Sequence, residues 1–153
     1  MCTGIALVAS ELPATLIAGL KDRVYLREGH EELQFHWWQA PTLLPVRWEG
    51  SLRMVRWGST ARRSPLPFGG WITREQVDSG MLSQAGPQDG VIPANMGQHK
   101  GTWFLILEGI RAVVLTEVPG GPVAYMLTEP STYYYRNMTE QSPMMPVFVN
   151  QVI

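Results

Sequence analysis

Short apolar runs, several with alternating polar positions, recur along the chain and predict a structure made mostly of β-strands. Residues 4–10 form a continuous apolar run typical of a buried strand. Many short strands with few helices indicate an α+β domain built around antiparallel sheets. The remaining strands are expected at residues 33–40, 51–58, 102–107, 110–118, 123–128 and 145–149.

Three segments are predicted to contain helices. Residues 11–24 carry an apolar stripe at helical spacing, and Ser10 before them is a suitable N-cap. Shorter helices are expected within residues 71–81 and within residues 129–140. These helices are too few and too short to build a layer of their own, so they are expected to cover the sheets.

The predicted loops fall where Pro, Gly and Ser gather. Residues 59–70 and 83–90 are rich in these residues, and Pro41 and Pro45 are expected to interrupt the segment after the second strand. The loop at 59–70 is the one candidate boundary between domains. Neither flank contains enough apolar residues for a separate core, so residues 1–153 are expected to form a single domain.

The composition excludes several classes of protein. Hydrophobic residues make up 45% and charged residues 16%, which is unlike a disordered chain. The one cysteine allows neither an internal disulfide nor a Cys-based zinc site. No apolar run approaches the length of a membrane span, and the start lacks the charges of a secretory signal. A cytoplasmic protein without cofactor, metal or membrane partner is therefore expected.

Positive charge is concentrated in one segment. Residues 47–74 contain six arginines and one acidic residue, and three tryptophans are interleaved with them. Arginine and tryptophan together are typical of a groove that grips phosphates and stacks bases, and Trp57 is the candidate platform. The alternative is a solvated face above core tryptophans. The candidate phosphate contacts are Arg53, Arg56, Arg62 and Arg63.

Cys2 is the candidate nucleophile. Removal of Met1 gives a cysteine whose free α-amine and thiol lie on adjacent carbons, and such a pair closes a five-membered thiazolidine ring on an aldehyde. The alternative is an inert buried cysteine. No recognisable metal spacing connects the three histidines, and His36 and His30 are expected to be a hydrogen-bonded histidine in a strand and a solvated one in a turn.

Four short motifs occur in a characteristic order. They are Met1-Cys2-Thr3-Gly4, Met54-Val55-Arg56-Trp57-Gly58, Ile92-Pro93-Ala94-Asn95-Met96-Gly97 and Met144-Met145-Pro146-Val147. The chain resembles the SOS response-associated peptidase (SRAP) family, whose members crosslink to abasic sites in single-stranded DNA. The resemblance runs through nearly the whole chain, which is shorter than is usual in the family. It implies an α+β fold, Cys2 as nucleophile and Arg74 as a phosphate contact beside the lesion.

The chain departs from the SRAP pattern at three positions that the family uses in catalysis. An asparagine is replaced by Ile72 or Thr73, a glutamate by His99 or Lys100, and a histidine by Ser142 or Pro143, while Met144 replaces an arginine. His99 is the candidate acid–base group in their place, since its ordinary pKa suits proton transfer near neutral pH. Lys100 is a candidate for steadying a phosphate or forming a transient imine.

The sequence therefore supports two main readings. In the first, the protein binds single-stranded or abasic DNA, crosslinks to it through Cys2 and associates with the nucleoid when bound. Any peptidase activity is then self-cleavage before Cys2. In the second, it is a catalytically degenerate relative that binds DNA or a protein without chemistry. A β-rich domain that binds a small molecule is the third possibility.

Overall fold

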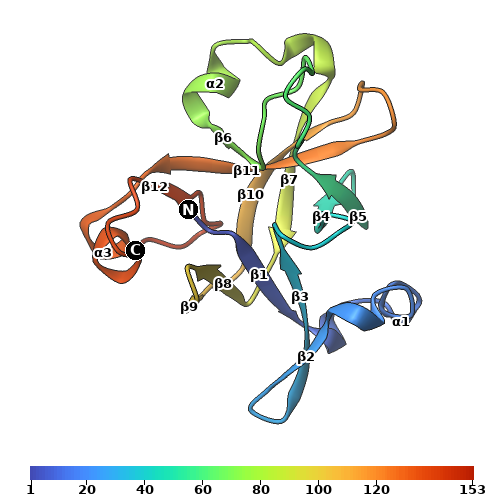
Figure 1. The fold of residues 1–153 in the computed structure, drawn as a ribbon, viewed down its shortest axis with the longest axis vertical. Helices are drawn as coiled ribbons and strands as arrows, with labels where there is room; N and C mark the ends of the chain where they lie inside the picture. Colours follow the sequence, from blue (N-terminus) through green and yellow to red (C-terminus); the bar gives the residue numbers. More distant parts are fainter.

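Two sheets carry most of the chain in the computed structural model, which describes all residues from Met1 to Ile153 (Figure 1). The first sheet has five strands in the order β2-β3-β1-β8-β9, and every neighbouring pair is antiparallel. The central position of β1 places the N-terminal segment next to the β8–β9 hairpin. These strands are β1 (Gly4–Val8), β2 (Val24–Arg27), β3 (His30–His36), β8 (Met96–His99) and β9 (Thr102–Leu105).

The second sheet has seven strands in the order β10-β7-β4-β5-β11-β12, with β6 also paired to β11. An additional β10–β11 pairing closes five of these strands into a ring. Only β5 and β6 run parallel to β11, so the predicted α+β class with mostly antiparallel strands is confirmed. The strands are β4 (Leu43–Trp48), β5 (Ser51–Trp57), β6 (Trp71–Thr73), β7 (Pro87–Pro93), β10 (Gly109–Leu115), β11 (Val123–Pro130) and β12 (Met144–Pro146).

The three α-helices are short. They are α1 (Ala14–Ile17), α2 (Arg74–Asp78) and α3 (Tyr133–Met138), and 3₁₀ turns occupy Ala9–Glu11, Lys21–Arg23 and Ser83–Ala85. Thr73 begins α2 with a capping box, because its hydroxyl accepts from the Gln76 backbone while the Gln76 side chain accepts from the Thr73 backbone. The predictions of short helices within 71–81 and 129–140 are confirmed.

The prediction of one helix over residues 11–24 is wrong. Only α1 is helical there, and Val24 instead begins β2, where it pairs with Leu33. The apolar stripe is real in the sense that Leu20 is buried. It is satisfied by a turn and a strand packed on the sheet, because tertiary packing overrides helical spacing in so short a segment.

Two strands occupy segments where breaks were expected. In β4, Pro45 lies opposite Met54, three pairs from the Trp48–Ser51 pair that closes the hairpin. Alternate antiparallel pairs exchange hydrogen bonds, so this position needs no N–H toward β5 and accepts a proline. The loop predicted at 83–90 is likewise half strand, because β7 begins at Pro87.

The core fixes the position of the N-terminus. Its larger cluster contains 24 buried residues and includes Cys2, which is fully buried. A smaller cluster of 8 buried residues lies on the other side of β10 and β11. No helix of the structure is long and apolar enough to cross a bilayer. In Figure 1 the N-terminus lies beside α3 and β12, whereas β5 with its arginines lies on the opposite side of the view.

Candidate functional site

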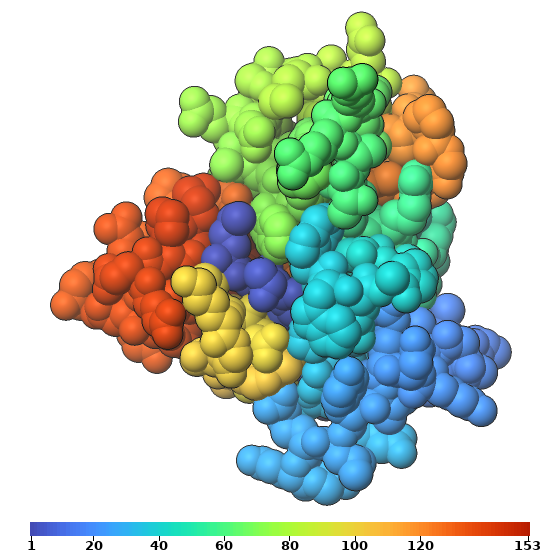
Figure 2. Space-filling model, viewed as in Figure 1, coloured from blue at the N-terminus to red at the C-terminus, as the bar shows by residue number.

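The first residues of the chain form a short extension of β1 that is held on both sides. The Thr3 backbone N–H donates to Gln98 at 2.8 Å, and the Trp37 backbone N–H donates to Thr3 at 2.9 Å. Met1 is 38% exposed and Cys2 is fully buried. Figure 2 shows this segment, in dark blue, at the surface between the yellow β8–β9 hairpin and the red-orange C-terminal segment. The N-terminus is therefore a fixed part of the surface.

Two side chains contact the Met1 residue directly. His99 Nδ1 lies 2.8 Å from the α-amine nitrogen and 2.6 Å from the Met1 carbonyl oxygen. With a proton on Nδ1 the ring donates to the carbonyl, and without one it accepts from the amine. The α-amine also donates to Ser142 Oγ at 3.1 Å, and that hydroxyl donates to the Met144 carbonyl at 2.8 Å. The scissile side of the Met1–Cys2 peptide is thus held by a group able to transfer protons.

The β8–β9 hairpin brings His99 to this position. Lys100 and Gly101 form its two-residue turn with φ angles of 47° and 81°. Glycine fits the second position because it adopts positive φ without steric cost. His99 is the last residue of β8 before that turn, and β8 pairs with β1. The pairing of these strands, far apart in the sequence, is what joins His99 to Met1.

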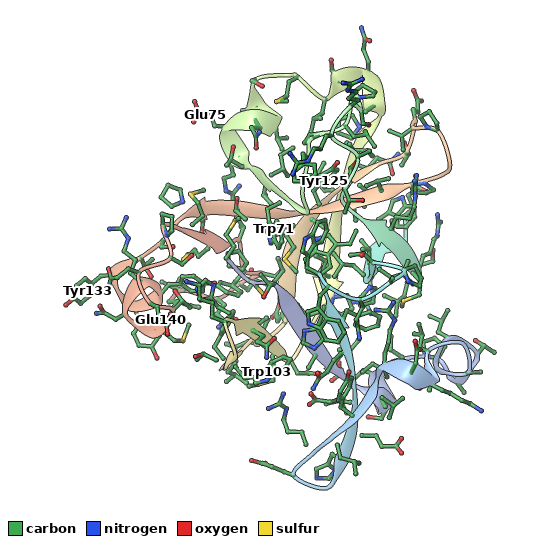
Figure 3. All side chains as sticks on the ribbon, viewed as in Figure 1. Trp71, Glu75, Trp103, Tyr125, Tyr133 and Glu140 are labelled. Atoms are coloured by element: carbon green, nitrogen blue, oxygen red, sulfur yellow. The ribbon has the colours of Figure 1, made fainter.

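The thiol of Cys2 is neutral in this environment. Its sulfur donates to the Gly4 carbonyl at 3.1 Å, and Trp71 Nε1 donates to the Cys2 carbonyl at 2.9 Å. Burial raises the pKa of Cys2 to about 11. Burial also lowers the pKa of the Met1 α-amine, and the positive charge of Lys100 adds to this effect. Figure 3 shows Trp71 near the centre of the molecule.

The buried thiol predicts a loss of stability at high pH. Between the reference pKa of 9.0 and the folded pKa of about 11, only the unfolded chain loses this proton. The unfolded state then binds fewer protons, so the unfolding free energy falls as pH rises, by about 3 kcal/mol over the window. Urea unfolding at pH 8 to 11 should therefore show a steeper decline for the native chain than for Cys2→Ser. Parallel declines would contradict the assignment, because other groups titrate equally in both proteins.

The arginines of β5 lie away from the N-terminus. Arg53 pairs with Glu49 at 3.7 Å. Arg56 donates to the carbonyls of Pro119 at 3.1 Å and Gly121 at 2.6 Å. These contacts tie both guanidinium groups to neighbouring turns. No arginine hydrogen-bonds to Met1 or Cys2, so the structure does not bring the arginines of β5 into the N-terminal site.

The other basic candidates are distributed over three places. Arg62 and Arg63 are exposed on the predicted loop at 59–70 and form no ion pair. Arg74 begins α2 and lies 3.4 Å from Glu129. Arg74 follows directly on β6, whose first residue is the tryptophan that holds the Cys2 carbonyl. Of these three, Arg74 is therefore the one joined to the N-terminal site by a short strand.

Lys100 lies close to the N-terminal site. It follows His99 in the hairpin turn, and its amine is 4.0 Å from Glu140, with both side chains largely exposed. Its charge acts on the Met1 α-amine, as the lowered pKa of that amine shows. An exposed ion pair of this kind is weak, so Lys100 is free to exchange its carboxylate for another anion.

The structure assigns Trp57 to the core and corrects its prediction as a stacking platform. Its side chain is 2% exposed and donates to the Gly70 carbonyl at 2.9 Å. It packs edge-on against Trp37 and Trp71, with ring centroids 5.3 and 5.6 Å away. A base cannot stack on a ring that is already enclosed.

Other aromatic side chains are open to a ligand. Trp38 is 71% exposed and stacks on His36, and Tyr133 and Tyr134 on α3 are 82% and 63% exposed. The prediction that the three consecutive tyrosines cannot all be buried is confirmed, since only Tyr135 is enclosed. His36 bonds to a neighbouring glutamine and is buried, as expected.

Sequence reasoning overlooked what Ser142, Trp71 and Tyr135 do at this site. Ser142 was noted only as a replaced position, and its contact with the α-amine gave no local signal. Trp71 was counted with the arginine-rich segment, although its indole holds the Cys2 carbonyl. No group of three or more His, Cys, Asp or Glu residues is arranged to hold a metal ion.

The largest cavity is not at Cys2. It is a groove of about 480 Å³ between β9, α3 and the C-terminal residues, and its lining is almost entirely apolar. No family model, curated protein sequence or solved structure matches the chain. The functional interpretation therefore depends on the residues and their geometry.

Proposed function

We propose that the chain is a divergent SRAP-like protein that binds single-stranded DNA and captures the aldehyde of an abasic site through Cys2 once Met1 is removed. One observation carries the proposal: His99 and Ser142 both hold Met1, at 2.6 Å from its carbonyl oxygen and 3.1 Å from its α-amine. These residues stand where the SRAP pattern has a glutamate and a histidine. Segments far apart in the sequence thus meet at the residue that the pattern makes the nucleophile.

The geometry suits capture by the amine first. After removal of Met1, the Cys2 nitrogen becomes a free α-amine one bond from the former position of the carbonyl held by His99. This amine attacks the aldehyde carbon, water leaves, and an imine forms. His99 is placed to accept and return the protons of this step. The neutral state of the thiol does not hinder it, because the amine makes the first bond.

The thiol completes the ring. Its sulfur adds to the imine carbon, the C=N double bond becomes single, and the thiol proton passes to the nitrogen. The product is a five-membered thiazolidine, formed without an oxidant or a cofactor. The same His99 contact supports removal of Met1 by the chain itself, since a donor at the carbonyl oxygen polarises the peptide bond that would be cut.

The exposed basic and aromatic residues support binding to DNA. Arg62 and Arg63 are the arginines that can take a phosphate without breaking an ion pair, whereas Arg53 and Arg74 must exchange a carboxylate for it. Exposed Tyr133 offers a surface for stacking a base, a contact of about 1–3 kcal/mol. Affinity from such contacts is expected to be insensitive to sequence and sensitive to salt.

A second candidate function is binding without covalent chemistry. It is favoured by the full burial of Cys2 and by the absence of a groove beside its sulfur. In that case the same basic and aromatic residues bind DNA, or a protein takes its place, and the N-terminal site is only structural.

The test uses the chain with Met1 removed, verified by intact mass, and the chain that retains it. Each is incubated with a single-stranded oligonucleotide carrying one abasic site, or with the same oligonucleotide intact, and run on a denaturing gel. We expect an adduct only for the Met1-free chain with abasic DNA. Binding that weakens with salt but gives no adduct would favour the second candidate. No binding at low salt would overturn both and leave a small-molecule site as the remaining reading.

A further inference from the structure

Buried polar atoms without a partner gather next to the N-terminal site. The structure has three of them: Trp48 Nε1, Ser131 Oγ and Tyr135 Oη. Two of the three belong to residues 131–135, the segment that leads into and forms the first turns of α3. Native proteins pair nearly all such groups, so an orphaned hydroxyl in a rigid core calls for a physical explanation.

Tyr135 is held firmly, so its orphaned hydroxyl is not the result of a loose side chain. The residue is 0% exposed, and its ring packs edge-on against Phe104 at a centroid distance of 5.7 Å. The backbone of α3 is fixed at both ends, because Thr132 caps its N-terminus and Thr139 donates to the Tyr135 carbonyl. Its neighbour Tyr133 points away from the molecule in Figure 3, which leaves Tyr135 as the inward member of the run.

The hydroxyl lies within electrostatic range of Cys2. Both side chains belong to the same buried cluster, and both are fully enclosed. Burial raises the pKa of Tyr135, and a negative charge on Cys2 raises it further. Tyr135 therefore stays protonated and keeps a donor available when the sulfur is charged.

The sulfur needs a donor only when it reacts. As a thiol it donates to the Gly4 carbonyl at 3.1 Å, which satisfies it. As it gives up its proton it can only accept, and the carbonyl oxygen then faces it with a lone pair. A charged sulfur at this depth requires a new donor, because an unpaired buried charge is strongly destabilised.

We propose that the Tyr135 hydroxyl donates a hydrogen bond to the Cys2 sulfur as that sulfur becomes charged during ring closure. The inference rests on the proposed function and names the group that supports the sulfur in it. No atom is transferred to or from Tyr135: the thiol proton goes to the imine nitrogen, and the hydroxyl keeps its own. The hydroxyl has no hydrogen-bond partner in the resting protein because its partner forms only in the reaction.

The test is Tyr135→Phe, which removes the hydroxyl and keeps the ring. Since that hydroxyl has no partner to lose, the variant should resist urea as well as the native chain does. In the Met1-free chain, the pH profile for alkylation of Cys2 by iodoacetamide should move to higher pH, and alkylation at neutral pH should be about 10-fold slower. Adduct formation with abasic DNA should slow by a similar factor.

Tyr125→Phe is the matched control. The Tyr125 hydroxyl is also on a fully buried residue, but it donates to the Pro67 carbonyl at 2.7 Å. Its loss should lower stability and leave the alkylation profile unchanged. A native alkylation profile for Tyr135→Phe would overturn the inference, whether or not the protein forms adducts. Absence of an adduct with the native chain would instead overturn the proposed function, because alkylation needs no DNA.

Discussion

Met1-free chains carrying Cys2→Ala should form no adduct that survives a denaturing gel. The N-terminal alanine still has an α-amine next to His99 and forms an imine with the aldehyde. Without sulfur the imine cannot close to the thiazolidine, and water reverses it during denaturation. The expected effect is loss of the adduct band to background, measured with the same abasic oligonucleotide at matched protein and salt. Binding under native conditions should persist, because the exposed arginines are unchanged.

Cys2→Ser and borohydride provide the controls for this result. Serine keeps a donor that can bond to the Gly4 carbonyl as the thiol does, so the N-terminal segment should stay in place. Reduction with borohydride should trap the imine of the native chain, Cys2→Ala and Cys2→Ser alike. An adduct of Cys2→Ala that survives without reduction would contradict the role of sulfur. The nearest other amine is Lys100, and its replacement by glutamine would then identify or exclude it as the source.

Turn residues and apolar alternation were sufficient to predict most of the fold. The strands that begin or end at clear turns, such as β5 and β11, were predicted to within about two residues. Strand β7 was missed because Gly86-Pro87 and Asp89-Gly90 look like turns. Gly90 instead lies in the strand, where a Cβ atom would meet Val46 at 3.0 Å. A glycine required by close packing and one required by a turn look the same in a sequence.

The site was predictable in its parts and not in its assembly. Cys2 and His99 were singled out for their chemistry, but only the pairing of β1 with β8 brings them together. Ser142 reaches Met1 because α3 and β12 pack beside it, which no local pattern encodes. Composition indicated a basic groove, yet Arg53 and Arg74 bind carboxylates from turns and strands that the sequence does not place beside them. Local rules determine elements, whereas contacts between distant segments determine a site.

The Arg-Trp-Gly motif is explained by the fold. Val55 and Trp57 alternate onto the buried face of β5, and Arg56 between them faces outward. Gly58 has a φ of +60°, and a Cβ atom there would lie 2.1 Å from the Gly69 carbonyl oxygen. The motif therefore closes the 59–70 segment against the core. Its resemblance to a DNA-binding pattern is a resemblance in architecture first.

Trp57→Ala should lower the unfolding free energy by about 3–5 kcal/mol, the usual cost of removing a buried tryptophan. The loss is large because the ring contacts Trp37 and Trp71 and its indole N–H bonds to Gly70. Urea unfolding followed by circular dichroism measures it. Trp38→Ala, at an exposed tryptophan, should change stability by about 0.5 kcal/mol or less.

DNA binding separates the two roles of these tryptophans. Trp57→Phe keeps a ring in the core, so its affinity for single-stranded DNA should equal that of the native chain under conditions where it is folded. If Trp57 stacked a base, this variant would bind more weakly while remaining folded, and its assignment to the core would be wrong. Because Trp71 also donates to the Cys2 carbonyl, Trp57→Ala should in addition loosen the N-terminal segment. Faster alkylation of Cys2 in that variant below its unfolding transition would show that the tryptophan cluster keeps the nucleophile enclosed.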